Sequence, residues 1–138
     1  VTPTSLIPFN VIEFITIAST GNSIRFGDLT QRRVSMGAVS SSIRGVFAGG
    51  YTSPTSVNTI DYITIASTGN AINFGSLTAN RSDISSASSS IRGLFATSNV
   101  IEYITISTTG NSITFGTLLP SSSNGVAGCS DAHGGLGD

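Results

Sequence analysis

The sequence has few charged residues. Only 9% of its 138 residues are charged, with six Arg, no Lys and seven acidic side chains, for a formal net charge of −1. Ordinary globular proteins carry about a quarter. A nucleic-acid-binding protein needs a basic patch that neutralises phosphates, and this chain has no basic run. We therefore expect no nucleic-acid partner.

The side chains that build catalytic and metal sites are equally scarce. The chain has one Cys, one His and no Trp. One Cys excludes an internal disulfide and cannot by itself form a cysteine zinc site. No run of 18 apolar residues exists, so we expect no membrane insertion, and the stretch from Val1 to Thr4 lacks the basic and apolar segments of a signal peptide. We expect no enzymatic activity, no cofactor and no metal.

A repeated unit dominates what is present. The segment Asn10–Asn22 (Asn-Val-Ile-Glu-Phe-Ile-Thr-Ile-Ala-Ser-Thr-Gly-Asn) returns at Asn58–Asn70 and again at Asn99–Asn111. Residues 10–50 match residues 58–98 at 24 of 41 positions without a gap. Such a period indicates a repeat architecture. We divide a single domain, residues 1–138, into units of about 10–57, 58–98 and 99–138, with residues 1–9 as a linker or the end of a preceding segment.

Each unit predicts short antiparallel strands and no helix. β-Branched and aromatic residues favour strands at 12–18, 60–66 and 101–107, followed by second strands at 23–27, 71–75 and 112–116. The glycines of the intervening Thr-Gly-Asn, Gly21, Gly69 and Gly110, suggest hairpin turns with positive φ. Ser-rich third strands are expected near 34–41, 82–89 and 123–130, and fourth strands begin at residues 43, 91 and 132. The seven extra residues of the first unit, around 50–57, predict a longer loop.

Four-stranded units of this length predict an all-β fold of β-propeller-like blades. Three blades are fewer than the usual four to eight, so we expect a homo-oligomer or association with other proteins. The first strand pair, 10–29, lacks partners that the C-terminal 123–138 could supply, within one chain or between two. A three-sheet β-prism or a β-trefoil is the alternative.

The residues also resemble known families. Their order resembles that of kelch repeats: a Gly-Gly strand at residues 45–50 (Gly-Val-Phe-Ala-Gly-Gly), then an apolar strand, then an Arg, Arg33 or Arg81. The chain departs from kelch repeats because residues 97–98 are Thr-Ser and the kelch Trp is absent. The repeat with Phe-Gly-Asp-Leu-Thr, and the ending at 127–136, is similar to tail-fibre and virion structural proteins of marine cyanophages. The resemblance implies a structural part of the virion, an extracellular particle, in a tail or head fibre with a possible role in host attachment. It transfers no catalytic residue.

Acidic and basic residues recur at fixed positions of the repeat. Glu13, Asp61 and Glu102 share one strand position, and Arg44, Arg92 and His133 share another. Paired carboxylates could perform glycosidase chemistry, but recurrence favours a structural task. We predict that these acids pair with Arg44 and Arg92 between neighbouring blades. His133, near Cys129 and Asp131, lacks the second cluster that a metal or nucleophile site needs, so we interpret it as structural.

Two further interpretations remain open. Serine runs at 40–42, 88–90 and 121–123 favour tight inner strands over glycan acceptors or hydroxyl arrays. The three Thr-Gly-Asn turns could each hold a sugar, which makes a lectin-like carbohydrate-binding module, with a host-surface glycan as ligand, the alternative to a structural protein. A kelch-type enzyme would need a cofactor cluster that the sequence lacks.

Overall fold

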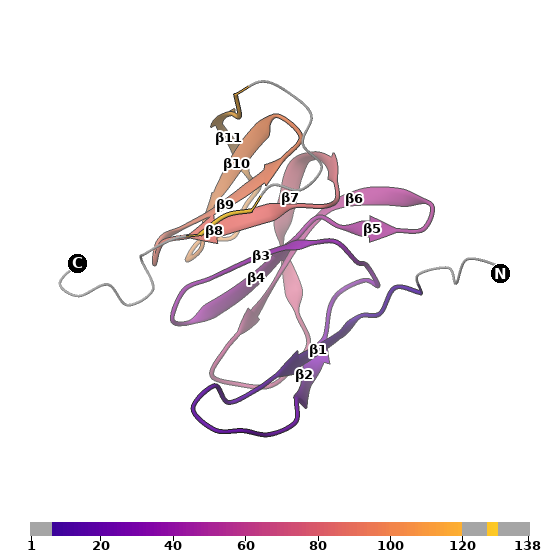
Figure 1. Cartoon of the computed structure of the whole chain (residues 1–138), viewed down its shortest axis with the longest axis vertical. Helices are drawn as coiled ribbons and strands as arrows, with labels where there is room; N and C mark the ends of the chain where they lie inside the picture. Colours follow the sequence, from indigo (N-terminus) through magenta and orange to yellow (C-terminus); the bar gives the residue numbers. More distant parts are fainter. Residues whose placement is uncertain (1–6, 120–126, 130–138) are drawn as a thin grey trace.

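A computed structural model describes residues 7–119 and 127–129, and β-strands are the only regular elements within them. The strands form three sheets in which every pairing is antiparallel (Figure 1). This confirms the all-β class. Across the described residues, none of the three sheets closes on itself.

The sheets succeed one another along the chain. The first sheet pairs β1 (Val11–Phe14) with β2 (Ile24–Asp28). The second runs in the order β3 (Gly37–Ser40), β4 (Arg44–Ala48), β6 (Thr55–Thr64) and β7 (Ile72–Arg81), with β5 (Tyr51–Thr52) on the start of β6. The third runs in the order β8 (Ser85–Ser88), β9 (Arg92–Thr97), β10 (Val100–Thr105) and β11 (Ile113–Thr117).

Each four-stranded sheet combines two strands from the end of one sequence repeat with two from the start of the next. The first sheet contains only the two strands that begin a repeat. The β1–β2 pair is therefore equivalent to the β6–β7 pair of the second sheet and to the β10–β11 pair of the third. All three pairs share one irregularity, a register shift at Ile12/Glu13, Ile60/Asp61 and Ile101/Glu102. A bulge re-aims the side chain beside it, and here that side chain is the recurring acid. The expected partners of the first sheet, 123–138, lie largely outside the described residues.

The Thr-Gly-Asn segments differ from the expected tight turns. The turn comes earlier, where the Ser19 amide donates to the Thr16 carbonyl at 3.2 Å, with equivalent bonds from Ser67 and Thr108. Gly69 and Gly110 then have a nearly extended φ of 159°, and none of the Asn residues in these segments has a positive φ. The segments are extended because they reach across to a neighbouring sheet, as described below.

The seven extra residues of the first unit lie where a longer loop was expected. They form a small hairpin in which Tyr51 pairs with Ser56 and Thr52 pairs with Thr55 across a cis Ser53–Pro54 bond. The hairpin extends β6 beyond the rest of the second sheet (Figure 1).

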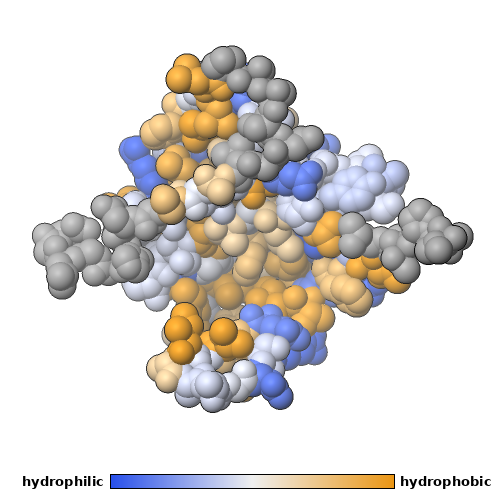
Figure 2. Space-filling model, viewed as in Figure 1, coloured by the Kyte–Doolittle hydropathy of each residue, from blue (hydrophilic) through white to orange (hydrophobic). Residues whose placement is uncertain are grey.

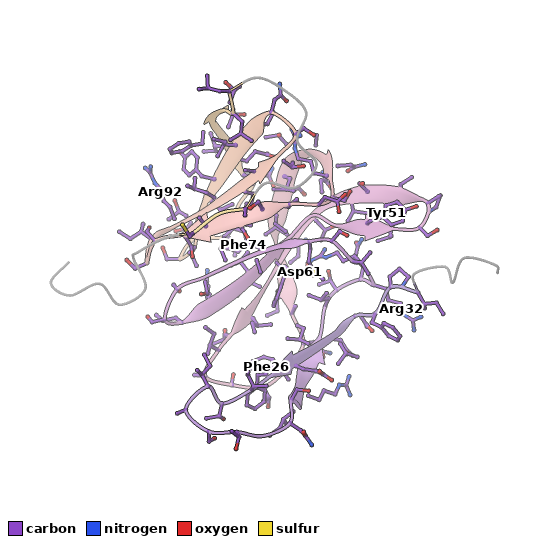
Figure 3. All side chains as sticks on the ribbon, in the orientation of Figure 1. Phe26, Arg32, Tyr51, Asp61, Phe74 and Arg92 are labelled. Carbon is purple, nitrogen blue, oxygen red and sulfur yellow. The ribbon has the colours of Figure 1, made fainter. Side chains whose placement is uncertain are left out.

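Two apolar clusters hold the sheets together, and each lies between successive sheets. The first-to-second cluster contains Ile12, Phe26, Leu29 and Ala71, and Met36, Phe47 and Ile63 pack against it. The second-to-third cluster contains Val39, Val46, Ala48, Ile60, Phe74, Leu77, Phe95, Ile104 and Ile106. Figure 3 shows Phe26 and Phe74 in these two places. The core is therefore the sum of two sheet-on-sheet interfaces.

The third strands of the first two units, β3 and β8, lie against each other. The Ser86 hydroxyl accepts a hydrogen bond from the Ala38 amide at 3.1 Å and donates one to the Ala38 carbonyl at 2.7 Å. Small side chains permit this approach. The serines of the runs themselves shape the following turns, because the Ser41 and Ser89 hydroxyls accept bonds from the amides two and three residues on. The run at 121–123 lies outside the described residues.

Candidate functional site: the interface between successive sheets

The second and third Thr-Gly-Asn segments bind the last strand of the preceding sheet through their backbone. The Gly69 amide donates to the Phe26 carbonyl at 3.0 Å and the Ala71 amide to the Asp28 carbonyl at 2.8 Å. The Asn70 side-chain oxygen accepts from the Asp28 amide at 3.0 Å. This recurring segment is therefore an inter-sheet clamp.

The next interface repeats the same bonds. The Gly110 amide donates to the Phe74 carbonyl and the Ser112 amide to the Ser76 carbonyl, both at 2.9 Å. The Asn111 side-chain oxygen accepts from the Ser76 amide at 3.0 Å. Two of the three Asn side chains in the segments proposed to hold a sugar, Asn70 and Asn111, therefore already accept hydrogen bonds from the protein backbone.

The Phe-Gly pair that receives the clamp needs its glycine. A Cβ atom on Gly27 would overlap the Gly69 carbonyl, and one on Gly75 would overlap the Gly110 carbonyl. Both contacts are with backbone, which cannot rotate away as a side chain can. A Cβ on Gly116, the third member of the series, would meet nothing within 4 Å.

A buried ion pair crosses the first interface. Asp61, at the centre of the molecule in Figure 3, is fully buried with Arg33, whose Nη2 donates to Oδ2 at 2.9 Å. Thr30 adds bonds to the same carboxylate from its amide at 3.1 Å and its hydroxyl at 2.7 Å. Burial lowers the pKa of Arg33, and the carboxylate of Asp61 opposes this shift. The donors all come from the segment that follows β2.

The second interface holds the equivalent pair. Arg81 Nε donates to Glu102 Oε2 at 2.9 Å, and the Thr78 amide and Ser112 hydroxyl each donate to Oε1 at 2.8 Å. Burial raises the pKa of Glu102, but the hydrogen bonds from Thr78 and Ser112 and the charge of Arg81 together bring it below its ordinary 4.5. The carboxylate is thus held ionised.

The predicted pairing with Arg44 and Arg92 was wrong. Arg44 lies over the Tyr62 ring, 4.5 Å from its centroid, and Nη1 donates to the Ile106 carbonyl of the third sheet at 3.0 Å. Arg92 lies over the Tyr103 ring at 4.9 Å. Each guanidinium packs on a tyrosine of the paired strand, Tyr62 or Tyr103. The acids Asp61 and Glu102 instead bind arginines that follow the last strand of the preceding sheet or end it.

Sequence reasoning missed the true cation partners. Arg33 and Arg81 share a spacing, Phe-Gly-x-Leu-Thr-x-x-Arg, which spans residues 26–33 and 74–81. Recurrence makes Arg33 and Arg81 candidates for contact with the acids, but Arg44 and Arg92 recur as well, so the repeat spacing does not choose between the two sets.

The first member of the acid series stands apart. Glu13 is exposed, and its hydrogen-bond donor among the described residues is the Ser23 hydroxyl at 2.9 Å, within its own sheet. The described residues give Glu13 no ion pair. The surface around Glu13, Ile15, Ile17 and the segment 20–22 is hereafter the leading face.

The opposite end of the sheet series is also open. Phe115 is 54% exposed, whereas the equivalent Phe74 is 3% exposed. Gly116 follows it, and Arg92 packs on Tyr103, which contacts Phe115. Within the described residues these two lack the inter-sheet contacts that Gly75 and Arg44 make. The surface formed by Arg92, Phe115, Gly116 and Leu119 is hereafter the trailing face. Figure 2 shows hydrophobic residues gathered at both ends, over β1–β2 and over β10–β11.

The burial of the isoleucine at one repeat position, Ile17, Ile65 or Ile106, increases with the number of strands in the preceding sheet. Ile17, with no preceding sheet among the described residues, is 95% exposed; Ile65, behind the two-stranded first sheet, is 45% exposed; and Ile106, behind the second sheet, is fully buried. The leading face therefore has the residues of a buried interface, and no neighbouring sheet covers it in the part of the chain that the structure describes.

Other parts of the described structure offer little chemistry. Residues 7–119 and 127–129 contain no group of three or more His, Cys, Asp or Glu side chains that could hold a metal. No helix long and apolar enough to cross a membrane is found in that part of the chain. Cys129 is exposed, and His133 lies outside the described residues. A polar cavity of about 270 Å³ beside Arg81 is lined by Ser56, Asp83 and Thr97, among others.

No protein-family model matches the chain, and no curated protein is significantly similar to it.

Proposed function

We propose that the chain is a non-enzymatic structural protein of a phage particle, a tail or head fibre component whose sheets are kelch-like, propeller-type blades. The observation that carries the proposal is the pair of open faces. Ile17 and Phe115 are exposed at positions where the chain's own interfaces bury Ile106 and Phe74. A protein that stacks blades through one repeated interface, and leaves that interface open at both ends, is suited to assembly.

The arrangement of the sheets supports the blade interpretation. The second and third sheets contain the four-strand antiparallel orders β3-β4-β6-β7 and β8-β9-β10-β11 and share one apolar cluster, and their first strands, β3 and β8, lie against each other. In a propeller the first strands of the blades line the axis. Small residues such as Ser86 and Ala38 suit that position.

The buried acids support a structural role. Asp61 and Glu102 are held by donors from the preceding sheet, so their recurrence serves the interface. A glycosidase would need two such carboxyl groups facing one substrate. Here each carboxylate faces a guanidinium and a threonine.

Further sheets can come from other virion proteins, or from other copies of the chain at contacts that do not bury Glu13. A heterologous, head-to-tail contact of this kind forms rings when its rotation closes and filaments when it does not. Both outcomes suit a fibre or appendage, and exposed residues of such a structure can contact the host surface.

The test is location. An antibody raised against the purified chain should label purified particles of a phage that encodes this sequence, at a tail or fibre. The matched control is a particle preparation from a phage without the sequence. Protein recovered from infected cells but absent from washed particles would refute the proposal. A glycan array on the same chain separates host attachment from pure assembly, since binding that Asn22→Ala abolishes would favour the lectin-like alternative.

A further inference from the structure

The two internal interfaces show what covers the recurring acid. Asp61 receives the amide and hydroxyl of Thr30 and the guanidinium of Arg33. Glu102 receives the amide of Thr78 and the guanidinium of Arg81. In both cases the donors belong to the preceding sheet, and the arginine follows the threonine by three residues. The acid is therefore bound in both cases by the threonine and the arginine of one pattern, Phe-Gly-x-Leu-Thr-x-x-Arg.

Glu13 on the leading face already has the inner half of this arrangement. Ser23 donates to Glu13 at 2.9 Å, just as the equivalent Ser112 donates to Glu102 at 2.8 Å. The same register shift precedes both acids. What Glu102 has and Glu13 lacks, among the described residues, is the threonine and the arginine of a preceding sheet.

The chain's own C-terminal segment cannot supply them. The third copy of the pattern, Phe115 to Ser122, has Leu119 in place of the threonine and Ser122 in place of the arginine. Residues 93–138 contain no Arg or Lys at all. A second copy docked tail-first on the leading face would offer Glu13 neither the threonine nor the arginine of the pattern. Its trailing-face cation, Arg92, holds the repeat position of Arg44, whose guanidinium binds the Tyr62 ring and the Ile106 carbonyl and not the acid. Glu13 would then be buried unpaired, which is strongly unfavourable for a carboxylate.

We propose that the leading face binds a different partner: a β-sheet protein whose last strand ends in Phe-Gly-x-Leu-Thr-x-x-Arg, with its guanidinium on Glu13 and its Phe-Gly pair under the Thr20–Asn22 clamp. Charge complementarity selects this partner over a second copy. The inference deepens the proposed assembly function and rests on it, since it names the partner of one open face.

The test uses the full chain as both components. The donor carries Leu119→Thr and Ser122→Arg, which restore the pattern, and Glu13→Gln, which removes its own acceptor. The acceptor is the unmodified chain, and the matched control acceptor carries Glu13→Gln. Sedimentation velocity of donor–acceptor mixtures measures each dissociation constant.

The donor should bind the unmodified acceptor at least about tenfold more tightly than the Glu13→Gln acceptor, as expected for a charge-assisted hydrogen bond. A donor without the changes at 119 and 122 should not discriminate between the acceptors. Equal affinity for both acceptors, or no complex with either, overturns the inference.

A peptide keeps the test decisive if the donor fails to fold. Residues 72–82 carry the native Leu77, Thr78 and Arg81. Added to the labelled full chain, this peptide should shift the NMR signals of Glu13 and of the 20–22 segment. Titration gives its dissociation constant, and the Arg81→Ala peptide should bind with a dissociation constant at least about tenfold higher. No difference between the two peptides contradicts the inference. Particle labelling does not depend on either binding result. If the antibody labels the particle but the donor does not bind, the proposed function stands and the proposed partner is wrong.

Discussion

The carbonyl of Gly110 occupies the place where a Cβ atom on Gly75 would stand. The two residues lie 35 positions apart and belong to different sheets, yet neither sheet could approach the other as it does if Gly75 had a side chain. The glycine of the Phe-Gly pair is thus a requirement of the interface.

Gly75→Ala should therefore lower the free energy of unfolding by about 1–3 kcal/mol, because the added methyl group forces backbone apart. Gly116→Ala is the matched control, since its Cβ would meet nothing within 4 Å and the unfolding free energy should stay unchanged. Urea unfolding followed by circular dichroism measures both. Equal losses in the two variants would mean that the glycine matters for the strand and not for the interface.

Glu102→Gln should lower the free energy of unfolding by about 2 kcal/mol. The amide keeps an acceptor for Thr78 but leaves the guanidinium of Arg81 without its anion. The cost stays under the 3–5 kcal/mol of a fully buried pair, because Arg81 retains some solvent contact. Glu13→Gln, the same change at the exposed repeat position, should leave urea unfolding unaltered. A Glu102→Gln protein that melts like the parent would remove the structural role of the pair.

The same pair predicts a pH dependence. The pKa of Glu102 in the folded chain lies below its ordinary 4.5, so the stabilisation is complete above that pH and is lost as the pH falls through the folded value. Unfolding free energies of the parent and of Glu102→Gln, measured from pH 7 to pH 3, should converge at the acidic end. A difference that stays constant across the range would show that the ionised carboxylate contributes nothing.

Arg44 and Arg92 share a repeat position but should contribute differently to the free energy of unfolding. Arg44→Met removes both a cation–π contact and a charged hydrogen bond to the Ile106 carbonyl, and should cost about 1.5–3 kcal/mol. Arg92→Met removes only the contact with Tyr103, and should cost under about 1 kcal/mol. Thermal unfolding of the two variants ranks them. The reverse order would place the more important contact on the trailing face.

The repeats were enough to predict most of the described strands, the exception being β5 in the expected loop at 50–57. Ile, Phe and Tyr at alternate positions of segments such as 60–64 favour strands in any context, and three copies fix their order. The sequence also marked Asp61 and Glu102 as structural. It did not reveal their partners, because Arg33 reaches Asp61 only after two sheets stack, and linear spacing within one repeat carries no record of that stacking. The Thr-Gly-Asn segments misled for a related reason: their composition suits a tight turn, whereas contact with the neighbouring sheet extends them.

Every sheet of four strands takes half its strands from each of two successive repeats, and this offset has an evolutionary consequence. A tandem duplication of residues 58–98 would insert a closing pair for one sheet and an opening pair for the next, so that the lengthened chain would gain one complete sheet. The leading and trailing faces would keep their residues. Such a protein can change its length by whole steps without losing the partners at either end.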